Sequence, residues 1–216
     1  MEETKKHLDS LSEIKNLMER STKFISLSGI SGVIAGITAL IGAAVAYLRL
    51  DYYLGTVSMD YSTTRNVTIE SIQTLTIELI GIALAVLVVS LIAGVVLTIK
   101  ETKKNGQSIW DKNSMLLLSN LLIPLGTGGM FCLILLYHNL FVLVAPATLI
   151  FYGLALVNSS KYTVTEIKYL GILEIILGLL SAIFVGKGLF FWSIGFGILH
   201  IIYGTLMHFK YNKKSS

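Results

Sequence analysis

Six long apolar runs, separated by short polar segments, fill the chain between residues 24 and 209. A run of about 20 apolar residues forms an α-helix that can cross the hydrocarbon core of a bilayer, which is roughly 30 Å thick. We therefore expect an all-α, polytopic membrane protein whose six transmembrane helices form a single bundle over residues 24–209. The predicted spans are 24–50, 75–100, 115–137, 140–157, 167–184 and 189–209.

Residues 1–23 follow a different pattern, in which apolar side chains recur at helical spacing among Lys, Glu and Asp residues. The apolar positions are Leu8, Leu11, Ile14, Leu17 and Met18. This pattern predicts an amphipathic helix on the cytoplasmic membrane surface or against the bundle. A helix that docks a partner or self-associates is the alternative. Residues 210–216 are predicted to form a basic cytoplasmic tail.

The composition agrees with a protein that is solvated by the lipid bilayer. Hydrophobic residues make up 54% of the chain and charged residues 14%, whereas soluble domains have a charged fraction of about 25%. The one cysteine, Cys132, cannot form an intramolecular disulfide. Attraction to anionic inner-leaflet lipid accounts for the net charge of +4, so we predict no nucleic-acid partner.

Basic residues lie in alternate polar segments, which predicts the topology because Lys and Arg in short loops stay in the cytoplasm. The basic segments are the N-terminal region, the loops around 103–112 and 161–168, and the tail. With six spans, both termini are cytoplasmic, and we expect a multi-pass protein of a bacterial inner membrane. The opposite side then holds one polar loop, 51–74, and two tight turns, at 138–139 and 186–188.

Small residues follow one another at four-residue steps in the first span, at Ser28, Gly32 and Gly36. This spacing leaves a groove along one face of the helix, against which another helix can pack closely. We expect that helix to come from the same chain. The alternative is a helix of a second copy, which would make the protein a homo-oligomer.

The last four spans carry a weak internal repeat with a period of about fifty residues. If the repeat is real, it predicts two helical hairpins with the same orientation in the membrane. Chance similarity between helices rich in Leu, Ile and Gly is the alternative. The matching segments are 120–126 with 172–178, 140–141 with 189–190, and 152–153 with 203–204.

Two ionisable residues are predicted to lie deep in the membrane, Glu174 in the fifth span and His200 in the sixth. At a rise of 1.5 Å per residue, each lies about 10 to 13 Å from the cytoplasmic end of its span. A tight turn joins these two spans, so the two side chains can meet at one level. Ionisable groups are costly to bury in lipid and are therefore the default functional candidates.

Other polar residues are expected in the same cytoplasmic half of the bundle. The predicted polar cluster consists of Glu174, His200, Asn120, Tyr152, Asn158 and Tyr203. In lipid, a carboxyl opposite an imidazole forms either a neutral hydrogen-bonded pair or an ion pair. Such a cluster could relay protons or hold a small polar ligand. A hydrogen-bonded clasp that only fixes helix rotation is the alternative.

The sequence contains no catalytic signature, and we expect no enzyme activity, no cofactor and no metal site. The glycine-rich segment 126–129 lacks the Lys-Ser/Thr ending of a phosphate loop. His200 and His208 fall on one predicted helix, so they cannot face each other as haem ligands.

Four segments, 24–29, 123–126, 152–162 and 195–204, resemble an uncharacterised family of small six-span bacterial inner-membrane proteins. The resemblance runs nearly end to end, and it implies a topology but no residue roles. The pattern at 171–178 and the hairpin repeat are also similar to the acid-resistance membrane proteins of the HdeD type, over about the last third of the chain.

These features predict a non-enzymatic structural, stress-related or signalling membrane component that acts through protein contacts, with a soluble cytoplasmic protein as a candidate partner. A small transporter or channel that uses the cluster around Glu174 and His200 is the alternative. The two differ in one structural feature, because a transporter needs a water-accessible cavity that reaches the cluster.

Overall fold

The computed structural model describes residues 29–54, 69–104 and 112–212, and within these ranges it is helical, with no strand. The predicted amphipathic helix at 1–23, Ser28, the centre of the polar loop and the end of the tail lie outside the described residues. The main helices are α2 (Gly29–Leu54), α3 (Ile69–Lys104), α4 (Lys112–Tyr137), α5 (Val144–Ser159), α6 (Glu166–Ile183), α7 (Gly188–Trp192) and α8 (His200–Asn212). A π-helix, η4 (Ser193–Leu199), joins α7 to α8 without a break.

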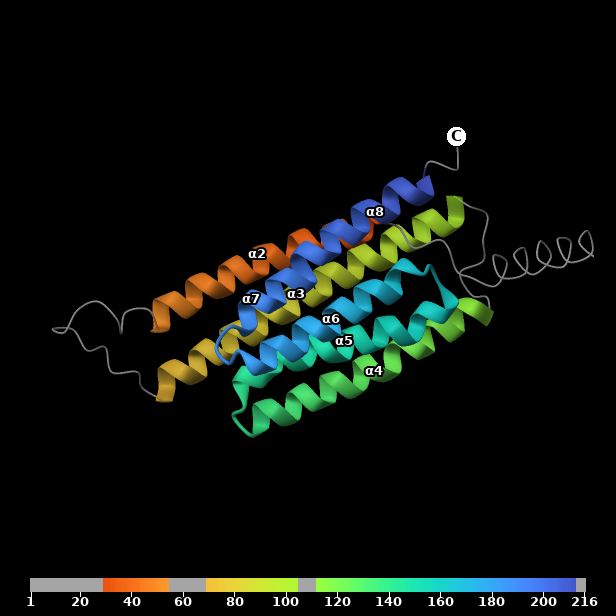
Figure 1. Cartoon of the computed structure of the whole chain (residues 1–216). Helices are drawn as coiled ribbons and strands as arrows, with labels where there is room; N and C mark the ends of the chain where they lie inside the picture. Colours follow the sequence, from red (N-terminus) through yellow and green to blue (C-terminus); the bar gives the residue numbers. More distant parts are fainter. Residues whose placement is uncertain (1–28, 55–68, 105–111, 213–216) are drawn as a thin grey trace, which may run out of the picture.

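The helices lie roughly antiparallel and form two groups (Figure 1). One group contains α2, α3 and the continuous segment α7–η4–α8, in which α2 packs against both α3 and α8. The other contains α4, α5 and α6, with α5 between its two neighbours. The two groups meet where α7, η4 and α8 face α5 and α6, and we call this contact the seam.

Two short turns close the helical hairpins. The turn between α4 and α5 places Asn139 at φ 58°, followed by the 3-10 turn Phe141–Leu143, and the turn between α6 and α7 places Gly186 at φ 87°. Glycine adopts this left-handed conformation without a steric penalty. Both tight turns fall where the sequence predicts them.

The helix bounds differ from the predicted spans mainly around the polar loop. The predicted loop began at residue 51, but α2 continues to Leu54 with Arg49 and Asp51 inside it, and α3 already begins at Ile69. The difference has a simple cause: backbone hydrogen bonds continue past the last apolar residue, while charged side chains at a helix end extend towards water.

Within the part of the chain that the structure describes, five helical segments are long and apolar enough to cross a membrane. They are Gly29–Tyr53, Glu70–Lys103, Lys112–Tyr137, Phe141–Tyr162 and Gly188–Lys210. Helix α6 has 18 residues and carries Glu166, Lys168 and Glu174, which places it near the lower limit of about 17 residues for a span. These observations confirm an all-helical fold that suits a membrane.

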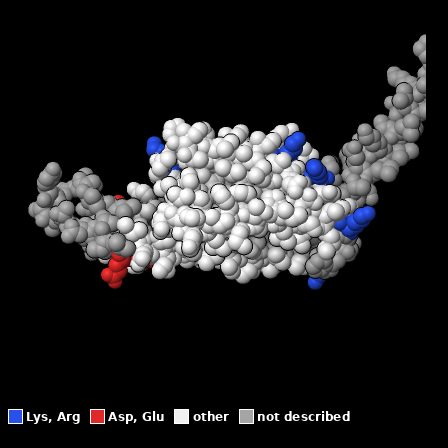
Figure 2. All heavy atoms as spheres, turned by 90° about the horizontal axis from the view of Figure 1, so that it is seen from below, with Lys and Arg blue, Asp and Glu red and all other residues white. Residues whose placement is uncertain are grey.

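The surface of the bundle carries a wide apolar belt. Ile77 and Ile183 are each 70% exposed, and Ile123 is 68% exposed. Figure 2 shows charged side chains near the two ends of the bundle and few between them. Such a surface would be a large exposed apolar patch in water. It is the expected surface for helices that face lipid.

Close helix crossings depend on glycine in both groups. A methyl group placed on Gly153 of α5 would lie 2.5 Å from the carbonyl oxygen of Gly171 of α6. On α2, Gly32 and Gly36 face the backbone of α8 and η4 at Gly204 and Gly197. The groove that the sequence predicts on this helix therefore receives a helix of the same chain.

Candidate functional site

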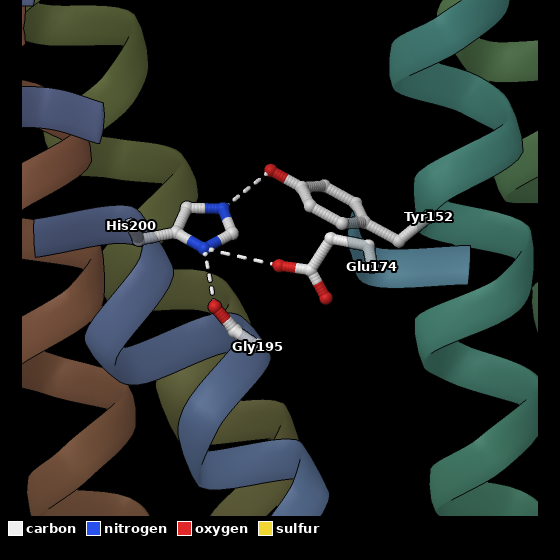
Figure 3. Close-up of polar contacts among 4 residues, drawn as sticks. All are labelled: Tyr152, Glu174, Gly195 and His200. Carbon is white, nitrogen blue, oxygen red and sulfur yellow. Dashed lines mark hydrogen bonds and ion pairs between the residues drawn. The ribbon is translucent and has the colours of Figure 1, made fainter. Parts of the chain in front are cut away.

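The seam contains a buried polar trio, which consists of Tyr152, Glu174 and His200. Tyr152 lies midway along α5, Glu174 lies midway along α6, and His200 is the first residue of α8. Figure 3 shows Tyr152 and Glu174 reaching from the α5–α6 side towards the imidazole ring of His200. The trio thus joins the two groups of helices through their side chains.

The contacts of His200 assign its tautomer. Nδ1 lies 3.0 Å from the carbonyl oxygen of Gly195, which can only accept, so Nδ1 carries a proton and donates it. Nε2 lies 2.7 Å from the hydroxyl of Tyr152. In a neutral imidazole Nε2 then accepts the Tyr152 hydroxyl proton, and in the cation the direction of this hydrogen bond reverses.

Glu174 is completely buried, at 0% exposure, yet its carboxyl group is poorly satisfied. Oε1 lies 3.5 Å from Nδ1 of His200, which is close enough for an ionic contact but longer than a hydrogen bond. Among the described residues, neither carboxyl oxygen has a hydrogen-bond partner. Most buried polar groups in proteins have a partner, so Glu174 is the exceptional member of the trio.

The π-helix precedes His200 and positions its side chain between Gly195 and Tyr152. The backbone N–H of His200 donates to Gly197, while its side chain turns back to the carbonyl oxygen of Gly195, five residues earlier. Gly195 also leaves room for Glu174, because a Cβ atom at this position would collide with the carboxyl oxygen Oε2. Single π-helical turns occur frequently at functional sites.

Aromatic rings cover one side of the trio. The ring of Phe196 lies 4.9 Å from that of Tyr152 and 5.8 Å from that of His200, measured between ring centroids, and Trp192 lies 5.0 Å beyond it. These apolar neighbours lower the local polarity. A charge on Glu174 or His200 is therefore costly unless the other group compensates it.

The remaining members of the predicted cluster lie apart from the trio. Asn158 donates from Nδ2 to the backbone oxygen of Asn120, 3.1 Å away, and Asn120 donates from Nδ2 to the oxygen of Leu116, 2.8 Å away. This pair links α5 to α4. Tyr203 is partly exposed on α8, and in the described part of the chain no hydrogen bond joins it to the trio.

Two charged contacts near the helix ends were not predicted. Arg49 of α2 lies 3.5 Å from Glu78 of α3, and the hydroxyl of Tyr53 lies 3.4 Å from the same carboxylate. The apolar pattern places Arg49 inside the predicted span 24–50 but does not determine which carboxylate on a neighbouring helix it faces. At the other end of the bundle, Lys210 of α8 pairs with Glu166 of α6.

The trio is suited to proton binding and unsuited to holding a metal. Within residues 29–54, 69–104 and 112–212 no three His, Cys, Asp or Glu residues converge as metal ligands. A cavity of about 980 Å³ lies between α2 and α7, but its walls include no member of the trio. Besides the Nδ1 proton of His200 and the hydroxyl proton of Tyr152, the trio can take up one proton on the carboxyl group of Glu174 and one on Nε2 of His200.

Comparisons with protein families, with curated proteins and with solved structures gave no match. The two family resemblances in the sequence therefore stay predictions, and the case for a function rests on the residues themselves.

Proposed function

We propose that this chain is a six-span protein of a bacterial inner membrane with both termini in the cytoplasm. In support of six spans, both ends of the described chain lie at the same end of the bundle (Figure 1). That end carries most of the exposed cations of the described helices, as expected for a cytoplasmic face. They are Lys100, Lys103, Lys112, Lys161, Lys168 and Lys210, whereas Arg49 and Lys187 lie at the opposite end.

Cysteine labelling tests this topology. In a Cys132→Ser background, a membrane-impermeant thiol reagent applied from outside should label Lys187→Cys and leave Lys161→Cys unlabelled until the membrane is opened. Lys161 and Lys187 lie at the two ends of α6 and are both exposed, so they form a matched pair. Labelling of both positions from one side would contradict six spans.

We further propose that the protein is a non-enzymatic signalling or stress-related component whose buried trio acts as a proton-responsive joint between the two helix groups. The observation that carries this proposal is the unsatisfied carboxyl group of Glu174 at the seam. A clasp that served only for stability would leave no such group, since an unsatisfied buried polar group costs about 1–3 kcal/mol. A change in protonation alters which contacts the trio can make.

In this proposal the joint changes how the two groups fit together, and a soluble cytoplasmic protein reads the change at the cationic end of the bundle. The cavity between α2 and α7 does not reach the trio, so the described structure provides no water path to it there. This arrangement favours signalling through protein contacts over transport.

The test measures a distance between the two helix groups as a function of pH. Spin labels on exposed positions of α2 and α4, for example Val45 and Met130, report this distance in liposomes from about pH 5 to about pH 8, the range in which histidine titrates. We expect a pH-dependent shift in the wild type that is absent in Glu174→Gln. Glu78→Gln, a half-buried carboxyl outside the trio, is the control and should keep the shift.

A distance that stays constant with pH in the wild type would overturn the joint. A shift that survives in Glu174→Gln would assign the pH response to other groups.

A small transporter is the second candidate, and the π-helix beside the trio is the observation that favours it. π-Helical turns inside longer helices occur frequently at functional sites. A proton and solute flux assay in liposomes, with Glu174→Gln as the comparison, tests this function. Flux that the substitution abolishes would favour transport, and labelling of Tyr203→Cys in a Cys132→Ser background would then trace the water path.

A further inference from the structure

The cavity between α2 and α7 has the form of a groove that is charged at one end and apolar along its length. Asp51, near the end of α2, and Lys187, in the turn before α7, contribute opposite charges. Leu40, Ala43 and Ala44 of α2 and Phe190 of α7 are among the mostly apolar residues that line the rest of the cavity, to which Tyr47 and Ser193 add hydroxyl groups. Its volume is about 980 Å³. The small side chains of Ala43 and Ala44 leave the space between the two helices.

The length of the groove matches one leaflet of a bilayer. Leu40 and Asp51 are both wall residues on the single helix α2, and eleven residues at 1.5 Å per residue correspond to about 16 Å. Half of a hydrocarbon core of roughly 30 Å is about 15 Å. A chain that entered at the charged end would therefore reach the middle of the membrane.

The two charges at this end of the groove select a headgroup. Lys187 can donate to phosphate oxygens, and the carboxylate of Asp51 can accept from a primary ammonium. Both side chains are exposed, and within the described ranges neither has an ion-pair partner. A phosphocholine headgroup has no N–H to donate, and a phosphoglycerol headgroup has no cation for Asp51.

We infer that this groove binds one phospholipid with an ethanolamine headgroup. Its phosphate contacts Lys187, its ammonium contacts Asp51, and one of its two acyl chains lies along Ala43 and Ala44. The inference rests on the proposed membrane placement of α2 and α7, with residues 51 and 187 at one interface. It is independent of the buried trio.

Native mass spectrometry of the full-length protein in detergent tests the inference. Phosphatidylethanolamine, phosphatidylcholine and phosphatidylglycerol with identical acyl chains are added at equal concentration. We expect the ethanolamine lipid to form adducts about two- to fivefold more often than the other two, as expected for one exposed charge contact. Equal adduct levels for all three lipids would overturn the headgroup assignment.

Three variants separate the parts of the site. Asp51→Asn should reduce the ethanolamine adduct to the level of the choline lipid, and Lys187→Gln should reduce the adducts of all three lipids. Ala44→Phe, which fills the groove without changing a charge, should also reduce all three. Lys161→Gln is the control, because it removes a lysine at the opposite end of the bundle, and it should leave the adducts unchanged. If Lys161→Gln reduces the adducts as much as Lys187→Gln does, the proposed site is overturned.

Other outcomes identify other occupants or other failures. A protein dimer that forms without lipid and is lost in Ala44→Phe would assign the groove to a second copy of the chain and overturn the lipid site. Glu174→Gln should leave the adducts unchanged, so the groove and the joint can fail separately. If Lys187→Cys and Lys161→Cys label from the same side, the membrane placement fails, and the lipid site fails with it.

Discussion

Gly153 of α5 and Gly171 of α6 are in reciprocal backbone contact, because a methyl group on Gly153 would lie 2.5 Å from the oxygen of Gly171 and one on Gly171 would lie 2.7 Å from the oxygen of Gly153. Only two residues without side chains allow this approach. Tyr152 lies next to Gly153, and Glu174 lies one turn after Gly171. The glycine crossing therefore sets the separation at which the trio meets.

Gly171→Ala should destabilise the protein by about 1–3 kcal/mol, the usual range for overpacking, because the obstacle is rigid backbone. The loss of helicity with temperature in detergent measures this effect. Gly81→Ala on α3 is the matched control, since a methyl group there meets nothing within 4 Å and alanine favours the helix by about 1 kcal/mol. Equal destabilisation by both substitutions would contradict the crossing.

Gly195→Ala should also destabilise the protein, because the new methyl group collides with the carboxyl group of Glu174. In the double variant Gly195→Ala with Glu174→Ala, the obstacle is gone. We expect the double variant to be more stable than the sum of the two single effects implies, with a coupling energy of about 0.5–3 kcal/mol. Additive effects in this double-mutant cycle would mean that the two residues do not touch.

Tyr152→Phe removes only the hydroxyl that contacts Nε2 of His200. The buried Nε2 then lacks its partner, which should lower the free energy of unfolding by about 1–3 kcal/mol. Tyr137→Phe is the control, since Tyr137 is 83% exposed and should tolerate the change. If Tyr152→Phe is as stable as the wild type, the hydroxyl contributes nothing to the seam.

The two asparagines should respond differently to substitution by leucine. Asn158 donates its side-chain N–H to α4, whereas Asn120 accepts that bond through its backbone and donates only within its own helix. Asn158→Leu should therefore destabilise the protein by about 0.6 kcal/mol, the mean for such bonds between membrane helices, while Asn120→Leu has a smaller effect. The reverse order in thermal unfolding would contradict this assignment.

The helices and the meeting of Glu174 with His200 could be predicted from the sequence. Apolar runs define helices in lipid, and the constant rise per residue places Glu174 and His200 at one level once the turn between their helices is short. Depth alone does not determine which way a side chain faces. For this reason Tyr152 lies within the trio, whereas Asn120, Asn158 and Tyr203, predicted with it, lie elsewhere.

The π-helix and the ion pair of Arg49 with Glu78 could not be predicted from the apolar pattern. A π-helix has more residues per turn than an α-helix, and here its formation depends on how Gly195 and His200 fit against Glu174 of α6. The apolar pattern of one helix carries no information about this fit. The predicted span 24–50 already contained Arg49, but the apolar pattern does not determine which face of α2 meets α3, so it could not pair Arg49 with Glu78.

Helix α3 has 36 residues, which corresponds to about 54 Å, and it packs mainly against α2 at the edge of the bundle. A helix of this length exceeds a core of roughly 30 Å even at a tilt of 40°, the upper end of the observed range. In the proposed membrane placement its ends project through the headgroups, and we expect a change in bilayer thickness to alter its inclination first. In a thinner membrane we expect α3 to tilt further, which would change the α2–α3 contact and leave the packing at the centre of the bundle as it is.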